Sequence, residues 1–304
     1  MLRAMYEPFF GLAGEPFSVA PDPRFMYLSA QHRDALRHLE VGLRGGGGFV
    51  LLTGEIGAGK TTVWRSFLEQ LPPTWDVATV VNPRLEVDAL LARLLEDLGV
   101  DMPEGGARDP IDALHGHLLL AHAQGRRTLI VIDEAQALSV PVLEQLRLLT
   151  NLVTGDRKLV QVLLIGQPEL HDMLERPELE PLASRVVARY HLGALPAEET
   201  RRYIAHRLAV AGNGGPPPFD DAALALVHAV TGGLPRRINV LCDRVLLAAW
   251  QARERRLGAP LVERAASEVF ARPQRRPAAI AAGPAAPAPV SHAPAAAALP
   301  APAD

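Results

Sequence analysis

The fold of this chain is decided by one stretch, which reads Gly54-Glu55-Ile56-Gly57-Ala58-Gly59-Lys60-Thr61-Thr62. The spacing Gly-x-x-x-x-Gly-Lys-Thr is typical of a phosphate-binding loop, whose backbone N–H groups surround the phosphates of a nucleotide while the lysine ammonium reaches the β- and γ-oxygens. These residues are therefore predicted to bind the phosphates of a nucleotide. The hydroxyl of Thr61 is the expected ligand of Mg2+ in such a loop.

Lys60 is one of two lysines in a chain with 29 arginines. A guanidinium is planar and too wide for the phosphate pocket, whereas a compact ammonium on a flexible stem fits it. Because nearly every other positive charge is an arginine, we infer that position 60 requires a lysine for its chemistry and not only for its charge.

The residues on either side of the loop complete a strand–loop–helix unit. Residues 49–53 form a short apolar run suited to a buried parallel strand. Residues 62–71 are predicted to be a helix with apolar residues at Val63, Phe67, Leu68 and Leu71. The N-terminus of that helix would direct its partial positive charge toward the phosphates.

A second motif, Leu129-Ile130-Val131-Ile132-Asp133-Glu134, places two carboxylates directly after four apolar residues. The pair is expected at the carboxyl edge of a buried strand, where doubly wound sheets bind ligands. We expect Asp133 to hold magnesium, directly or through water, and Glu134 to orient and deprotonate the attacking water. An isolated Asp-Glu pair could equally cap a helix, but its combination with the phosphate loop favours hydrolysis.

Polar residues also end two other predicted strands. Gln167 follows Leu164-Ile165-Gly166, and Asn82 follows Val80-Val81. Gln167 is predicted to sense the γ-phosphate or the attacking water, and Asn82 could hold Glu134 in an inactive rotamer. Either side chain could instead cap a helix or a loop.

Two arginines are candidates for stabilising the charge of phosphoryl transfer, which spreads over the equatorial oxygens. Arg236 lies in the run Gly232-Gly233-Leu234-Pro235-Arg236-Arg237 at the start of a predicted helix. Arg185 precedes the last predicted strand and would act on a neighbouring subunit, with Arg189 as the competitor for that role. A solvated surface charge is the alternative for each of them.

Strand-like and helix-like runs alternate from about residue 45 to residue 195, and only helical periodicity follows. Strands alternating with helices imply an α/β fold with a parallel sheet covered on both faces. The strands are expected at residues 49–53, 77–81, 128–132, 160–165 and 187–192. Helices of the second part are expected to begin at Pro196, Asp220, Leu234-Pro235 and Ala259-Pro260.

The predicted organisation has three parts. Residues 1–195 form a P-loop nucleotide-binding α/β domain, and residues 196–272 form a small helical lid domain. Residues 273–304, of which 22 are proline or alanine, are expected to be a disordered tail. Residues 31–44 are predicted to be a helix, and the Pro-rich and aromatic lead-in at residues 8–29 either covers the adenine or packs as ordinary core.

Composition excludes several classes of protein. The chain has 304 residues, 48% of them hydrophobic, which is ample for a core. Its net charge of −3 gives no global basic field for non-specific DNA binding. Cys242 is the only cysteine, so an internal disulfide and a cysteine-based zinc site are excluded. With no apolar run long enough to span a bilayer and no signal peptide, the chain is expected to be cytoplasmic.

The order of these motifs resembles that of the AAA+ ATPases. A narrower resemblance is to the ExeA (GspA) general-secretion ATPases and the related pilus-biogenesis ATPase MshM, and it covers residues 5 to about 270. It is carried by Tyr6-Glu7-Pro8-Phe9-Phe10-Gly11-Leu12, Glu15-Pro16-Phe17-Ser18, Pro21-Asp22-Pro23-Arg24-Phe25, Tyr27-Leu28-Ser29, His32-Arg33, Ile132-Asp133-Glu134-Ala135-Gln136-Ala137-Leu138, Leu143-Glu144-Gln145-Leu146-Arg147-Leu148-Leu149-Thr150-Asn151-Leu152 and Ile165-Gly166-Gln167-Pro168-Glu169-Leu170.

This resemblance implies that residues 54–62 bind ATP and that the chain is a Mg2+-dependent ATPase. It also implies a nucleotide-dependent homo-oligomer, for which a ring is one form. Family members of this kind energise assembly of a secretion or pilus envelope complex, which places them at the inner membrane. They typically continue into a transmembrane helix and a peptidoglycan-binding domain, whereas this sequence continues into its Pro/Ala-rich segment.

Two other functions compete with an assembly ATPase. One is a DNA-binding adaptor of the transposition-helper type, which the acidic balance and the lack of a recognisable winged-helix segment after Arg272 disfavour. The other is a nucleotide-gated scaffold that does not hydrolyse ATP, which the presence of Glu134 disfavours.

Overall fold

The computed structural model describes residues 6–20, 22–44, 47–81, 83–101, 109–155, 157–212, 214–215 and 217–270. These residues belong to one unit. The predicted disordered tail and the predicted restraint by Asn82 lie outside the described residues.

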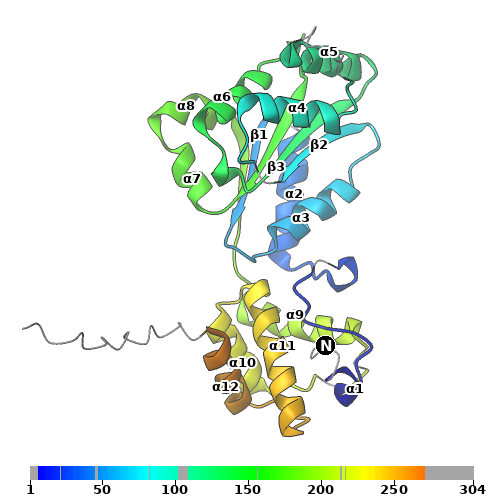
Figure 1. Cartoon of the computed structure of the whole chain (residues 1–304), viewed down its shortest axis with the longest axis vertical. Coiled ribbons are helices and arrows are strands. Elements are labelled where there is room, and N and C mark those ends of the chain that lie inside the picture. Colours follow the sequence, from blue (N-terminus) through cyan, green and yellow to red (C-terminus); the bar gives the residue numbers. More distant parts are fainter. Residues whose placement is uncertain are drawn as a thin grey trace, which may run out of the picture. The chain divides into compact units, whose positions relative to one another are not determined.

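A five-stranded parallel sheet forms the centre of the α/β part (Figure 1). Its spatial order is β2-β3-β6-β1-β7, so β6 lies between β1 and β3. All five predicted strands are present, which confirms the predicted α/β fold class. Their bounds are β1 Gly48–Gly54, β2 Trp75–Val81, β3 Arg127–Asp133, β6 Val160–Gly166 and β7 Val186–Leu192.

Helices cover both faces of this sheet because successive side chains of a strand point to opposite sides. In β1, Val50 and Leu52 pack with α2 and α3, whereas Phe49 and Leu51 belong to the cluster formed with α4 to α8. The helices are α2 Ala30–Arg44, α3 Lys60–Glu69, α4 Val87–Asp97, α5 Pro110–Ala123, α6 Val140–Leu149, α7 Glu169–Leu174 and α8 Glu180–Ala183.

Short elements connect these layers. The strands β4 Val153–Thr154 and β5 Arg157–Lys158 pair antiparallel. The 3-10 turns among the described residues are η2 Pro23–Phe25, η3 Ala135–Ala137 and η4 Pro177–Leu179.

Four helices form the lid, and they begin where the sequence predicted them. Asp220 caps α10 by accepting a hydrogen bond from the backbone N of Ala223 at 2.8 Å. Pro235 occupies the first turn of α11, where its missing N–H costs nothing. The bounds are α9 Ala197–Val210, α10 Asp221–Thr231, α11 Pro235–Ala252 and α12 Ala259–Phe270. No described helix has the length and apolar character needed to cross a membrane.

The N-terminal segment, residues 6–29, packs with the lid helices. It includes α1 Glu7–Phe10, and its buried side chains Tyr6, Leu12, Phe17 and Phe25 belong to the hydrophobic cluster of α9–α12. The hydroxyl of Tyr6 donates to Asp243 Oδ1 at 2.7 Å, across 237 residues of sequence.

A buried arginine of α9 fastens the same segment. The guanidinium of Arg207 donates to the carbonyl oxygens of Pro16 and Ser18 and to the hydroxyl of Tyr203. The predicted boundary at residue 195 remains a prediction, and both hydrophobic packing and hydrogen bonds group the N-terminal segment with the lid.

Candidate nucleotide-binding and hydrolytic site

The sheet order brings the phosphate loop and two further predicted site residues, Glu134 and Gln167, to one edge. Gly54 ends β1, Gln167 follows β6 and Glu134 follows β3, and these three strands are neighbours. A cavity of about 590 Å3 opens there. It is lined by the phosphate loop, the N-terminal segment, the start of α11 and Glu134. We call it the nucleotide cleft.

The phosphate loop has the backbone that its glycines predict. Gly57 has a φ of 83° and Gly59 a φ of 106°, values that residues with a Cβ rarely adopt. Helix α3 begins at Lys60, two residues earlier than predicted, because Gly59 occupies the N-cap position. No side chain caps this helix, so the N–H groups of its first turn are available to an anion.

Lys60 is only 7% exposed, and its ammonium is held inside the loop. Nζ donates to the carbonyl oxygens of Gly54 at 2.7 Å and of Glu55 at 3.1 Å. Burial lowers the pKa of Lys60, and the negative charges of Glu134 and Asp133 oppose that effect. To bind a phosphate, the ammonium would exchange carbonyl oxygens for more strongly charged acceptors.

Asp133 is 6% exposed, and both of its oxygens accept hydrogen bonds. Oδ2 accepts from the indole Nε1 of Trp64 at 3.3 Å, and Oδ1 accepts from the backbone N of Glu134 at 2.9 Å. Burial raises the pKa of Asp133. Thr61 lines the cleft and Asp133 does not, and the metal-binding role of both residues remains a prediction. The sequence analysis missed Trp64, although a buried indole N–H generally has a partner.

Glu134 is an exposed residue with a strained backbone. Its φ of 54° makes it one of two non-glycine residues with positive φ in the described part of the chain. Such strain is concentrated at functional sites in proteins. Its Oε2 accepts from Gln136 Nε2 at 2.6 Å and from Gln167 Nε2 at 3.1 Å. The hydrogen bond from Gln136 is the largest cause that lowers the pKa of Glu134, and the bond from Gln167 lowers it further. Partial burial of the carboxylate opposes both effects.

Gln136 is a residue of this site that the sequence analysis did not identify. Its Oε1 accepts from the backbone N of Gln167 at 3.1 Å. The available signal was its position in the run Asp133-Glu134-Ala135-Gln136, two residues after the carboxylate. The side-chain amide of Gln167 donates to Glu134. Gln167 does not line the cleft, and its sensor role remains a prediction.

Arg236 lies at the cleft. Its backbone N donates to the carbonyl oxygen of Gly57 at 3.2 Å, and a Cβ on Gly57 would lie 2.5 Å from the Cβ of Arg236. The lid helix α11 therefore contacts the phosphate loop directly. The guanidinium of Arg236 has no partner within the described residues, so it is available to a ligand in the cleft.

Arg185 lies at the opposite end of the sheet from the phosphate loop. Its carbonyl oxygen accepts from the backbone N of Phe49 at the start of β1, a seven-residue strand of roughly 20 Å. Its Nη1 donates to the carbonyl oxygen of Arg147 at 3.2 Å, near the end of α6. Arg185 therefore cannot reach the phosphate loop of its own subunit, and Arg189 is exposed on the edge strand β7.

A buried histidine supports the phosphate loop from the N-terminal side. His32 is 4% exposed, and its Nδ1 lies 2.6 Å from the hydroxyl oxygen of Ser29. A Cβ on Gly59 would lie 2.6 Å from His32 Nε2, so only glycine fits above the ring. Burial lowers the pKa of His32 to about 4, which keeps the ring neutral at pH 7. The sequence analysis assigned His32 no role.

This burial predicts a pH-dependent stability. The unfolded chain takes up a proton on His32 near pH 6.5 and the folded chain only near pH 4. Stability should therefore be lost as the pH falls through that window, by about 3 kcal/mol in total. The free energy of unfolding, measured in urea from pH 7 to pH 4, should fall less steeply in His32→Gln than in the wild type. Equal pH dependence in the two proteins would contradict this account.

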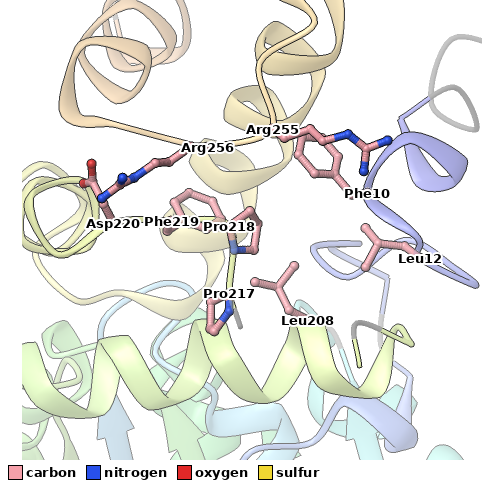
Figure 2. Close-up of a pocket in the computed structure, with 9 residues that line it drawn as sticks. All are labelled: Phe10, Leu12, Leu208, Pro217, Pro218, Phe219, Asp220, Arg255 and Arg256. Carbon is pink, nitrogen blue, oxygen red and sulfur yellow. The ribbon is translucent and has the colours of Figure 1, made fainter. Parts of the chain in front are cut away.

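A second cavity, of about 570 Å3, lies beside the lid helices and shares no lining residue with the nucleotide cleft. Figure 2 shows Phe10, Leu12, Leu208, Phe219 and two arginines around it. It contains no residue of the phosphate loop and none of the predicted catalytic residues.

Comparison with known proteins shows what this chain is similar to. The model of the AAA domain family matches residues 43–174. General secretion pathway protein A of Aeromonas hydrophila is 49% identical over 247 residues, which cover 81% of this chain and 45% of that protein. The chain thus spans less than half the length of this relative.

Solved structures share the fold. Cdc6p of Pyrobaculum aerophilum superposes with a TM-score of 0.65 at 16% identity, over 84% of this chain and 70% of that one. The ORC2 protein of Aeropyrum pernix, solved as ADPNP–ADP complexes, gives a TM-score of 0.62 at 18% identity, over 84% and 71%. At these identities the likeness shows the fold alone.

Proposed function

We propose that this chain, which belongs to the AAA ATPase family of general secretion pathway protein A, hydrolyses ATP to ADP and phosphate. The observation that carries the proposal is the carboxylate of Glu134, which amide donors orient at the edge of a cleft that also contains the phosphate loop. A nucleotide-binding scaffold without hydrolysis has no need of a strained, oriented carboxylate at that place.

The residues of the cleft fit a nucleoside triphosphate. The uncapped first turn of α3 and the ammonium of Lys60 would bind the phosphates, and Arg236 would approach them from the lid. Glu134 would accept a proton from the attacking water. The hydroxyl of Thr61 and, through water, Asp133 would hold Mg2+. Bound Mg2+ would neutralise negative charge that develops on the phosphate oxygens.

The test is release of phosphate from ATP by the purified chain. Turnover that requires Mg2+ and saturates with ATP is expected, and its absence at every protein concentration would reject the ATPase assignment. Peptidoglycan fragments and duplex DNA should be added in parallel. Stimulation by DNA that declines steeply with salt would favour the DNA-adaptor alternative instead.

We also propose a homo-oligomer in which Arg185 of one subunit serves the cleft of its neighbour. Support comes from the distance of Arg185 from its own phosphate loop. If Arg185 acts in this way, a mixture of Arg185→Ala and Lys60→Ala proteins should regain activity. In a mixed oligomer, the intact cleft of an Arg185→Ala subunit lies beside the intact Arg185 of a Lys60→Ala subunit. Phosphate release at a fixed total concentration measures this. If no activity is recovered, Arg185 does not act on the neighbouring subunit, and Arg189 becomes the candidate for that role.

The proposal of an envelope role rests on the similarity to general secretion pathway protein A. We propose that ATP turnover energises assembly of a secretion or pilus complex, by a protein that is cytoplasmic and peripheral to the inner membrane. Co-purification with secretion or pilus components, dependent on ATP and lost in Lys60→Ala, would support it. Equal recovery with the Lys60→Ala protein would count against a nucleotide-driven role.

A further inference from the structure

Gln136 uses both ends of its amide to connect two parts of the site. Its Nε2 donates to Glu134 Oε2 at 2.6 Å, and its Oε1 accepts from the backbone N of Gln167 at 3.1 Å. Gly166, the last residue of β6, leaves room for this contact, because a Cβ there would lie 2.7 Å from Gln136 Oε1. The amide therefore connects the carboxylate after β3 to the backbone at the end of β6.

This link determines how the carboxylate of Glu134 is presented. Glu134 is exposed, and an exposed glutamate samples several rotamers unless other groups hold it. Gln136 and Gln167 both donate to the same oxygen, Oε2. Oε1 has no hydrogen-bond partner within the described residues, so it is the oxygen left to accept a proton.

We propose that Gln136 is a positioning residue for ATP hydrolysis, which fixes the Glu134 carboxylate against the end of β6 so that Oε1 faces the attacking water. This inference rests on the proposed ATPase function. Gln136 does not line the nucleotide cleft, so it acts through Glu134 and not on the nucleotide. Only a residue with a donor and an acceptor at this reach makes both bonds, which explains why the position is a glutamine.

Two substitutions separate positioning from structural support. Gln136→Leu removes both hydrogen bonds. Gln136→Glu keeps an acceptor for the N–H of Gln167 but replaces the donor with a negative charge beside Glu134. If Gln136 only supported the loop after β6, the glutamate variant would behave as the wild type. If it positions Glu134, both variants lose turnover.

The expected result is a fall in kcat of about 10- to 100-fold in both variants, because a misplaced catalytic group costs roughly that much. The KM for ATP and the affinity for a non-hydrolysable ATP analogue should stay within about twofold of the wild type, since the phosphate loop is untouched. Gln145→Leu on α6 is the matched control and should keep the wild-type kcat, because the side chain of Gln145 makes no hydrogen bond in the described part of the chain.

The outcomes are distinguishable. Wild-type turnover in Gln136→Leu would overturn the inference and leave the ATPase function standing. Normal turnover in Gln136→Glu, with a drop in thermal midpoint and analogue affinity in Gln136→Leu, would assign Gln136 a structural role and also overturn it. A wild-type protein that releases no phosphate from ATP would overturn both proposals.

Discussion

Lys60→Ala is expected to abolish nucleotide binding. The ammonium is the one buried positive charge of the phosphate loop. Among the described residues, its Nζ donates to two carbonyl oxygens, which a phosphate can replace. Loss of a charge-assisted contact to phosphate, together with the void left behind, should weaken the affinity for ATP at least about 100-fold, or roughly 3 kcal/mol. Titration with a fluorescent ATP analogue measures this directly.

The other lysine of the chain provides the matched control. Lys158 lies in β5, outside the cleft, and Lys158→Ala should leave the affinity for ATP unchanged. Lys60→Arg tests the chemical requirement, because it keeps the charge but places a planar guanidinium in the pocket. Wild-type affinity in Lys60→Arg would show that position 60 needs only a positive charge.

Glu134→Gln is expected to separate binding from hydrolysis. The substitution keeps the size of the side chain and removes the base, so ATP should still bind at the phosphate loop. Removing a positioned general base typically lowers the rate about 10²- to 10⁴-fold. Single-turnover phosphate release, measured beside analogue binding, distinguishes the two effects.

A glutamate remote from the cleft serves as the control for this variant. Glu263 is exposed on α12, and Glu263→Gln should retain both binding and turnover. Normal turnover in Glu134→Gln would remove Glu134 from the role of base and leave the nucleotide-binding assignment intact.

The parts of the site that the sequence predicted are those encoded by neighbours along the chain. The phosphate loop needs glycines that allow positive φ at positions 57 and 59, and an apolar run before it supplies the strand. Because parallel strands carry their carboxyl ends to one edge, the positions of Glu134 and Gln167 followed from the apolar runs alone. The start of α3 was missed by two residues because the N-cap is a glycine and not a polar residue.

The contacts that the sequence did not predict join residues far apart in the chain. Trp64 and Asp133 are 69 residues apart, and Gln136 and Gln167 are 31 apart. Periodicity shows which face of a helix is buried, but it does not show which side chain of another element that face meets. The placement of Arg185 at the far end of the sheet likewise depends on the strand order.

The sequence by itself thus determined a phosphate loop, a parallel α/β sheet with helices on both faces and a helical lid, because short-range spacing encodes turns, strands and helix ends. The tertiary structure alone decided that residues 6–29 pack with the lid, that His32 supports Gly59, and that two amides share one oxygen of Glu134. These contacts depend on how distant segments pack and which rotamers fit together, and that information lies in the folded chain as a whole.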